Sequence, residues 1–374
     1  MNITSNFDSG NIEIVSINNN VIDLKIPKDT HSDFFQWFHF RLIDAKYKAC
    51  TINILNAGES TFPDGWENYH VCTSYDKIDW FRTPTTYKDG VLSFEINPEH
   101  NSVYFAYFAP YSYDRHQTLV HETQLHELCE LEVIGKTVQG KDIDLLKIGT
   151  PSAEKKNIWV IARQHPGESM AEWFIEGLVD RLLDEDDSVS LKLLEKACFH
   201  VIPNMNIDGS IAGNLRANCA GANLNREWAE PSLENSPEVY YALKKMDEVG
   251  IDLMLDVHGD EAIPYNFVAG SEGIPSYHEK MAILEDTFKR FWMDTCPDFQ
   301  DTHNYGKDEP GSANLTVCSN QIAERFDCLS FTIEMPFKDN DDIPNERYGW
   351  SAERSMSLGA SVLQPVLFVI DDLI

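Results

Sequence analysis

The sequence has no long apolar run and few basic residues. No stretch approaches the roughly 18 apolar residues that a membrane span needs, and the polar start Met1–Asp8 lacks the basic and apolar regions of a signal peptide. Only 30 Lys and Arg residues stand against 61 Asp and Glu residues, which gives a formal net charge of −31. We therefore expect neither nucleic acid nor an anionic membrane as a partner, because both repel an acidic surface.

Closely spaced cysteines are also absent. The eight cysteines lie far apart, at positions 50, 72, 129, 198, 219, 296, 318 and 328. A CxxC pair or a dense disulfide framework is therefore excluded, and so is a cysteine-rich metal site. This spacing indicates reduced, mostly buried thiols, and we expect a cytoplasmic protein.

The first 115 residues have the pattern of an all-β domain. A chain of 374 residues with 43% apolar residues can form one large domain or two ordinary ones, with a full core. Short segments of alternating apolar and polar residues are punctuated by Asn, Asp, Gly and Pro, which predicts a β-sandwich over residues 1–115. The expected strands are Ile12–Ser16, Val21–Ile26, Trp37–Leu42, Cys50–Leu55, Val91–Ile96 and Val103–Phe108.

From residue 116 onwards the pattern changes to alternating strands and helices. Asp114 is expected to cap a joining helix over residues 116–128, which a hairpin follows. The expected strands are Ile158–Ala162, Cys198–Pro203, Ile251–Val257 and Leu329–Glu334, and the expected helices cover residues 169–183, 237–249, 277–293 and 351–372. This alternation predicts an α/β domain whose partly parallel sheet is covered on both faces.

Polar residues follow four of these strands. His165 and Glu168 lie on a Pro-Gly turn, His258 and Glu334 end two other strands, and Asn204–Gly209 follows a fourth. Ligands bind beyond the carboxyl ends of such strands, and two His with one Glu form a known catalytic zinc set. A single histidine of this kind is more often a turn or core residue, but four strands converging in this way favour a site.

The order of these motifs resembles the zinc metallocarboxypeptidases. The motifs are His165-Pro-Gly-Glu168, Asn206-x-Asp-Gly209, Arg216, Asn225-Arg226, His258 and Thr332-Ile-Glu334. The N-terminal part, with Trp37–Arg41 and Pro110–Tyr113, resembles the cytosolic carboxypeptidase branch. The resemblance covers nearly the whole chain. It implies a carboxypeptidase-like α/β/α domain with a mixed sheet over residues 116–374, preceded by the all-β sandwich.

The resemblance also implies a role for each site residue. One zinc ion per chain is held by His165, Glu168 and His258, and Glu334 is the general base and later acid. Such acid–base help is worth about 10²–10⁴-fold. Arg216 polarises the scissile carbonyl, while Asn225 and Arg226 hold the terminal carboxylate of the substrate, for which a guanidinium fork is suited. The implied function is hydrolysis of the C-terminal peptide bond of peptides or proteins.

Three further residues concern the details of that function. Many members of the family have an acid where Asn223 stands, and an amide oxygen there can still accept the N–H of a zinc-bound histidine. Eukaryotic members of the branch remove glutamates from protein tails, so Arg325 is a candidate for contact with an acidic C-terminal side chain. Tyr305, on a Gly- and Pro-rich segment, is a candidate for contact with the terminal carboxylate.

Two other functions fit parts of the pattern. One is a zinc amidohydrolase or deacylase of small acylamino acids on the same fold. The intact Asn225-Arg226 pair and the long chain favour the peptidase over it. The other is a catalytically inactive binding protein that uses its N-terminal sandwich. The complete set of ligands and the presence of Glu334 argue against it.

Overall fold

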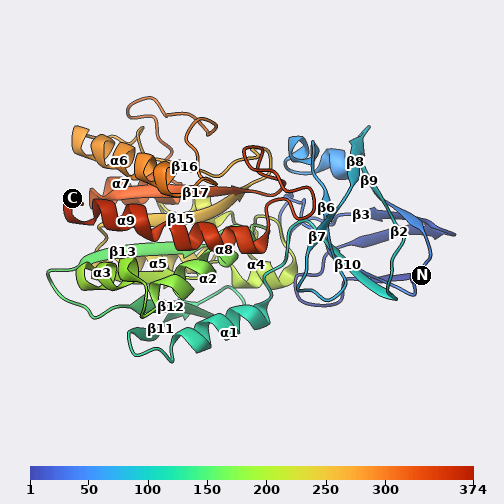
Figure 1. Cartoon of the computed structure of the whole chain (residues 1–374), viewed down its shortest axis with the longest axis horizontal. Helices are drawn as coiled ribbons and strands as arrows, with labels where there is room; N and C mark the ends of the chain where they lie inside the picture. The colour runs from blue at the N-terminus through green and yellow to red at the C-terminus, as the bar shows by residue number, and fades with distance from the viewer.

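The N-terminal part of the chain folds as two packed five-stranded sheets. The structure, a computed structural model, describes residues 1–374 (Figure 1). Rings from the two sheets meet in the core, where the ring centres of Phe94 and Phe105 lie 5.1 Å apart. The predicted β-sandwich is therefore confirmed. One sheet has the order β1 (Asn2–Thr4), β4 (His39–Ile43), β10 (Ser102–Ala106), β6 (Val71–Ser74) and β7 (Phe81–Thr83). The other has the order β2 (Glu13–Asn18), β3 (Val21–Lys25), β5 (Cys50–Ile54), β9 (Val91–Ile96) and β8 (Thr85–Lys88).

The helix that joins the two parts begins earlier than expected. Helix α1 (Tyr113–Thr123) starts after Ser112, whose hydroxyl accepts the N–H of Arg115 at 3.2 Å. The prediction that Asp114 caps a helix over residues 116–128 was therefore wrong. Ser112 has the extended backbone and short hydroxyl side chain of an N-cap, while Asp114 lies within the first turn. The predicted domain boundary between residues 115 and 116 falls inside α1 and stays a prediction.

The second part is built on a mixed seven-stranded sheet. Its order is β11 (Cys129–Lys136), β12 (Asp142–Ile148), β14 (Ala197–Ile202), β13 (Lys156–Ala162), β15 (Leu253–Asp260), β17 (Leu329–Pro336) and β16 (Phe267–Ala269). The four strands β14, β13, β15 and β17 run parallel, and the outer pairs are antiparallel. The parallel strands bring the carboxyl ends of β13, β15 and β17 to one edge of the sheet.

Helices cover both faces of this sheet. Alternate residues of β13 belong to different cores: Ile158 and Val160 pack in the core of α2 (Met170–Leu182), and Trp159 and Ile161 in that of α5 (Pro237–Val249). The core of α2 also receives α6 (Glu279–Thr295), α8 (Ala352–Ser361) and α9 (Leu363–Val369), and that of α5 receives α7 (Cys318–Phe326). This arrangement confirms the predicted α/β/α domain. The remaining helices are α3 (Ser188–Lys196), α4 (Ile207–Ala212) and the short 3-10 turns η1 (Ala57–Glu59), η2 (Pro63–Trp66), η3 (Leu224–Arg226) and η4 (Ile370–Asp372).

The expected closing helix over residues 351–372 is broken in the structure. Helix α8 ends at Ser361, and α9 starts at Leu363. Pro365 lacks the N–H that would bond to the carbonyl four residues earlier, and its ring crowds that carbonyl. The sequence pattern of apolar residues continues through the break, which is why the helix was predicted as one piece.

The two domains meet at the edge where the parallel strands end (Figure 1). Phe337, directly after β17, stacks on Tyr107 of the N-terminal domain at 4.4 Å. Arg82 of the same domain donates to the Phe337 carbonyl at 2.8 Å. Any site at the carboxyl ends of the strands therefore lies beside the N-terminal domain. No helix in the chain combines the length and the apolar character needed to cross a membrane.

Candidate active site

Three side chains converge at the carboxyl ends of β13 and β15. His165 Nδ1 lies 2.6 Å from Glu168 Oε1, and His258 Nδ1 lies 2.8 Å from Glu168 Oε2. The two imidazole Nδ1 atoms are 3.2 Å apart. All three residues are buried, and together they form a group that can hold a metal ion. Two imidazoles and one carboxylate leave a fourth position of a tetrahedral site free, as in catalytic zinc sites.

The outer nitrogen of each imidazole has its own acceptor. His165 Nε2 lies 3.0 Å from Asn223 Oδ1, and His258 Nε2 lies 3.0 Å from Asp256 Oδ2. An N–H directed at each of these oxygens leaves the Nδ1 lone pairs of both rings pointing at Glu168. Gln164 donates to the same Asp256 oxygen at 2.7 Å and fixes it in place. The amide oxygen of Asn223 thus occupies the position expected for it.

The surroundings of the two imidazoles shift their pKa values in opposite directions. Burial, helped by the charge of Arg216, lowers the pKa of His165 to about 4, so this ring is neutral as a metal ligand must be. Burial also works against a charge on His258, but the carboxylates of Asp256 and Glu168 outweigh it and raise its pKa. Positive charge is therefore favoured at His258, beside Asp256 and Glu168, whereas His165 stays neutral.

The turn that carries His165 and Glu168 is held by a buried arginine. Arg163 has a left-handed backbone with a φ of 60° and a fully buried side chain. Its guanidinium donates to the Pro166 carbonyl at 2.9 and 3.1 Å and to Glu172 at 2.8 Å. A residue without β-branching tolerates this backbone better than valine or isoleucine would. The carboxyl end of β13 is thus turned sharply, so that His165 faces β15.

Glu334 faces the same cluster from β17. It pairs in register with His258 on the neighbouring strand, and only 6% of it is exposed. Burial raises the pKa of Glu334 well above its usual range, and the neighbouring carboxylates of Glu168 and Asp260 raise it further. Its Oε2 atom is buried without a hydrogen-bond partner. A carboxyl group with a free oxygen in this position can accept and return a proton.

The predicted cationic residues line the same cleft, whose volume is about 440 Å³. Burial lowers the pKa of Arg226, and the nearby positive charge of Arg216 lowers it further. Asn225 is anchored because its Oδ1 accepts the N–H of Cys318 at 2.8 Å, and its Nδ2 lies 3.4 Å from His258 Nε2. The structure therefore brings Arg216, Asn225 and Arg226 into the cleft that also contains His165, Glu168 and His258.

Tyr305 also reaches this cleft. Its hydroxyl lies 2.6 Å from Asp260 Oδ2 and 3.0 Å from Glu334 Oε1. The residue is half exposed, and its ring packs edge-on against Phe267 of β16. A tyrosine at this position can contact a molecule that enters the cleft.

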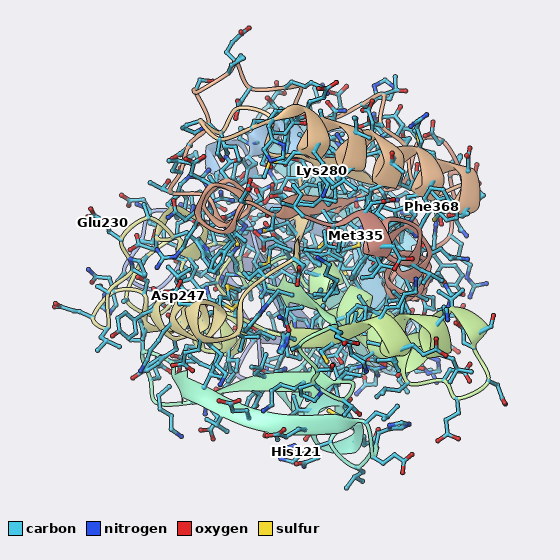
Figure 2. All side chains as sticks on the ribbon, turned by 90° about the vertical axis from the view of Figure 1, so that its left-hand side faces the viewer. His121, Glu230, Asp247, Lys280, Met335 and Phe368 are labelled. Carbon is cyan, nitrogen blue, oxygen red and sulfur yellow. The ribbon has the colours of Figure 1, made fainter.

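Arg325 does not reach the cleft. It lies in the last turn of α7 and donates two hydrogen bonds of 2.8 Å to Asp247 of α5, an exposed residue at the outer surface (Figure 2). The prediction that Arg325 contacts the substrate is therefore contradicted. Helix α7 presents Ile322 and Ala323 to the core, and this helical phase carries Arg325 to the surface.

Family models match almost the whole chain. The model described as zinc carboxypeptidase matches residues 119–349, and that described as cytosolic carboxypeptidase N-terminal domain matches residues 3–108. The chain belongs to the zinc carboxypeptidase family. Zinc is the cofactor of this family, and its members are hydrolases that act as exopeptidases. The donor set of two imidazoles and a carboxylate fits that ion.

Individual proteins show the same relationship. An uncharacterized protein of Zymomonas mobilis is 48% identical over 373 residues, which cover 100% of this chain and 97% of the other. Cytosolic carboxypeptidase 6 of Caenorhabditis elegans is 28% identical over 369 residues, with 89% of this chain and 78% of the other covered. A metallo-carboxypeptidase of Pseudomonas aeruginosa, solved in complex with (2-guanidinoethylmercapto)succinic acid, is 46% identical with a TM-score of 0.97 and 100% coverage of both chains.

Several residues around the zinc carboxypeptidase site were missed by sequence reasoning. Asp256 carries a signal that could have been used, because it stands two residues before His258 on one strand and shares its face. Asp260 and Glu261, which stand two and three residues after His258, line the cleft as well. Phe62 of the N-terminal domain also lines it, and no local pattern in the sequence connects this residue with the others.

Proposed function

We propose that the protein removes residues from the C-terminus of peptides or proteins, with His165, Glu168 and His258 as zinc ligands. The observation that carries the proposal is the convergence of these three donors with the buried, unpartnered oxygen of Glu334. Bound zinc supplies a Lewis acid that polarises a carbonyl and makes water acidic enough to attack near neutral pH.

The side chains of the cleft divide the remaining work. Glu334 takes a proton from the attacking water on Oε2 and returns it to the leaving amine. Arg216 places a fixed positive charge beside the oxygen that becomes negative during the attack. Asn225 and Arg226 bind the terminal carboxylate of the substrate. Because an internal peptide bond has no such carboxylate, this pair limits the enzyme to chain ends.

The lining of the cleft bears on which residue is removed. Arg216 and Arg226 are its only arginines or lysines, whereas six acidic residues line it: Glu168, Asp260, Glu261, Glu272, Asp308 and Glu334. Without Arg325, the predicted preference for acidic residues has lost the residue assigned to it. The Pseudomonas aeruginosa relative binds a ligand that carries a guanidine group together with succinic acid. We therefore propose that neutral and basic C-terminal residues are removed faster than glutamate.

Tyr305 contacts the bound substrate after its hydroxyl leaves Glu334 and Asp260. The protein works in the cytoplasm, in keeping with eight cysteines that are all unpaired.

Peptide cleavage tests the function directly. The zinc-loaded protein is incubated with peptides that vary in the last two residues, and the products are read by mass. We expect loss of single C-terminal residues, and no cleavage of the same peptides as C-terminal amides. Rapid cleavage of the amides would refute the role of Arg226, and equal rates for Glu, Gln and Lys would refute the proposed preference.

Metal content tests the ligand set separately. Wild-type protein is expected to hold about one zinc ion, and His165→Ala or His258→Ala is expected to lose it. His121→Ala is a matched control, because His121 lies exposed on α1 at the outer surface and does not belong to the metal-holding group (Figure 2). Full zinc occupancy in both site variants would reject the assignment.

A further inference from the structure

A buried carboxylate of the N-terminal domain holds the backbone that carries Arg216. Asp29, in the loop between β3 and β4, is only 4% exposed. Its Oδ1 accepts the N–H of Leu215 at 2.6 Å, and its Oδ2 accepts those of Arg216 at 2.7 Å and Ala217 at 2.9 Å. Three successive backbone N–H groups that point at one carboxylate form a strong anion-binding arrangement.

The neighbouring residues tie the same two segments together. The backbone N–H and the hydroxyl of Thr30 both donate to Asn214 Oδ1, each at 3.1 Å. Asn214 in turn donates to the Ala217 carbonyl at 2.9 Å. The loop is closed on its own side by the Asp29 N–H, which donates to the Phe34 carbonyl at 2.8 Å. The segment 214–217 is therefore fixed by the N-terminal domain at both of its ends.

The side chain of Arg216 is positioned by the same domain. Its guanidinium carbon lies 5.9 Å from the ring centre of Phe34 and 5.4 Å from that of Phe62. Cations are attracted to aromatic faces at such distances. Both rings belong to the N-terminal domain, and Phe62 lines the cleft itself. The backbone and the charged end of Arg216 are thus both held from outside the catalytic domain.

The segment also supports the turn that carries the proposed zinc ligands. The Leu215 carbonyl accepts the N–H of Gly167 at 2.8 Å. Gly167 lies between His165 and Glu168, and a Cβ atom on it would come within 2.9 Å of that carbonyl oxygen. Asp29 is therefore linked to the turn through Leu215, which hydrogen-bonds to both Asp29 and Gly167. Asp29 also accepts a hydrogen bond directly from the backbone of Arg216.

We infer that Asp29 is a positioning residue of the active site, through which the N-terminal domain sets the place of Arg216. The inference rests on the proposed function of Arg216. Burial raises the pKa of Asp29 to about 6, although the three N–H groups and the charge of Arg216 lower it. With this pKa the carboxylate is largely ionised at pH 7, and its negative charge strengthens all three hydrogen bonds.

Kinetics in two backgrounds test this inference. Asp29→Asn is made in the wild type and in Arg216→Ala, with Asp33→Asn as the matched control, since Asp33 is an exposed acid of the same loop. In the wild type, Asp29→Asn should lower kcat about 10- to 100-fold. An arginine displaced by roughly 1 Å no longer stabilises the negative charge that develops on the substrate oxygen. KM should change less than about threefold, since ground-state binding is kept. In Arg216→Ala the same substitution should change kcat less than about twofold, because residues that act as one unit are not additive.

Hydrogen exchange gives a readout that does not depend on activity. In Asp29→Asn the amides of Leu215, Arg216 and Ala217 should exchange faster, while those of the β-sandwich stay unchanged. Equal kcat losses in both backgrounds, or unchanged exchange at these amides, would overturn the inference. A wild-type protein that cleaves no peptide would instead contradict the proposed function, and the exchange result would still decide the role of Asp29.

A second variant covers the case in which Asp29→Asn does not fold. Phe34→Leu keeps the carboxylate but removes one ring beside the guanidinium of Arg216. It should lower kcat by roughly threefold in the wild type, as the loss of a cation–π contact predicts. In Arg216→Ala it should have no effect, and an equal loss in both backgrounds would also overturn the inference.

Discussion

At the scale of single residues, the two histidines of the site are oriented by different chemistry. Asn223 offers His165 a neutral amide oxygen, and Asp256 offers His258 a carboxylate. A carboxylate partner makes an imidazole a more basic ligand than an amide does. The two histidines are thus unequal donors, and His258 is the one whose partner can be tested by removing charge alone.

The first prediction concerns that partner. Asp256→Asn should weaken zinc binding by about 10- to 100-fold, because the outer N–H of His258 loses its charged acceptor. Zinc affinity is measured by competition with a chelating dye. Asp252→Asn is the control, since Asp252 immediately precedes β15 at its amino end and forms an ion pair with Lys156. Equal zinc affinity of the two variants would show that Asp256 does not act on the metal site.

The second prediction concerns Glu334. Glu334→Gln keeps the shape of the side chain but cannot take up a proton, so turnover should fall by about 10²–10⁴-fold. Zinc content and thermal unfolding should stay close to those of the wild type. Both kcat and zinc are measured on the same preparation, and an unchanged kcat would remove Glu334 from the mechanism.

At the scale of elements, helix α5 is joined to two loops by one buried acid. Glu238, in the first turn of α5, accepts the N–H of Val138 at 3.3 Å and the amide of Asn218 at 3.2 Å. Burial raises the pKa of Glu238 from 4.5 to about 7, with Asp208 adding to the shift and the hydrogen bonds opposing it. Ionising this acid is therefore less favourable in the folded protein than in the unfolded chain.

The third prediction follows from that difference in pKa. Protonation of Glu238 stabilises the fold below pH 4.5, and this contribution is lost as the pH rises from 4.5 through 7. In Glu238→Gln the side chain cannot ionise, so this loss of stability is absent. Relative to wild type, its free energy of unfolding should rise by up to about 3 kcal/mol between pH 4.5 and pH 8. Urea unfolding at several pH values measures this. The exposed neighbour Glu234→Gln should stay parallel to wild type, and parallel curves for both variants would contradict the prediction.

At the scale of the whole molecule, the net charge of −31 acts on the approach of substrates. A protein with this charge attracts cationic peptides and repels anionic ones over distances that salt shortens. This effect depends on the charge of the whole peptide. The lining of the cleft, in contrast, acts on its last residue, so the two can be separated.

The fourth prediction uses that separation. For a peptide rich in lysine away from its C-terminus, kcat/KM should fall roughly tenfold between low and high salt, because steering is screened. For a glutamate-rich peptide with the same last two residues, kcat/KM should rise. Steady-state rates at several salt concentrations measure both, and identical salt dependence for the two peptides would exclude steering by the net charge.

The sequence alone determined the elements and the catalytic candidates that depend on local patterns. Apolar periodicity located six of the ten sandwich strands and all four parallel strands. Residues at or just beyond the carboxyl ends of the parallel strands, such as His165, His258 and Glu334, had to meet at one edge of the sheet. Only the tertiary structure decided where the remaining side chains lie. Helical phase and a surface ion pair took Arg325 out of the cleft. Domain packing brought Asp29 to Arg216 across 187 residues of chain, and contacts of that sequence separation leave no periodic signal to read.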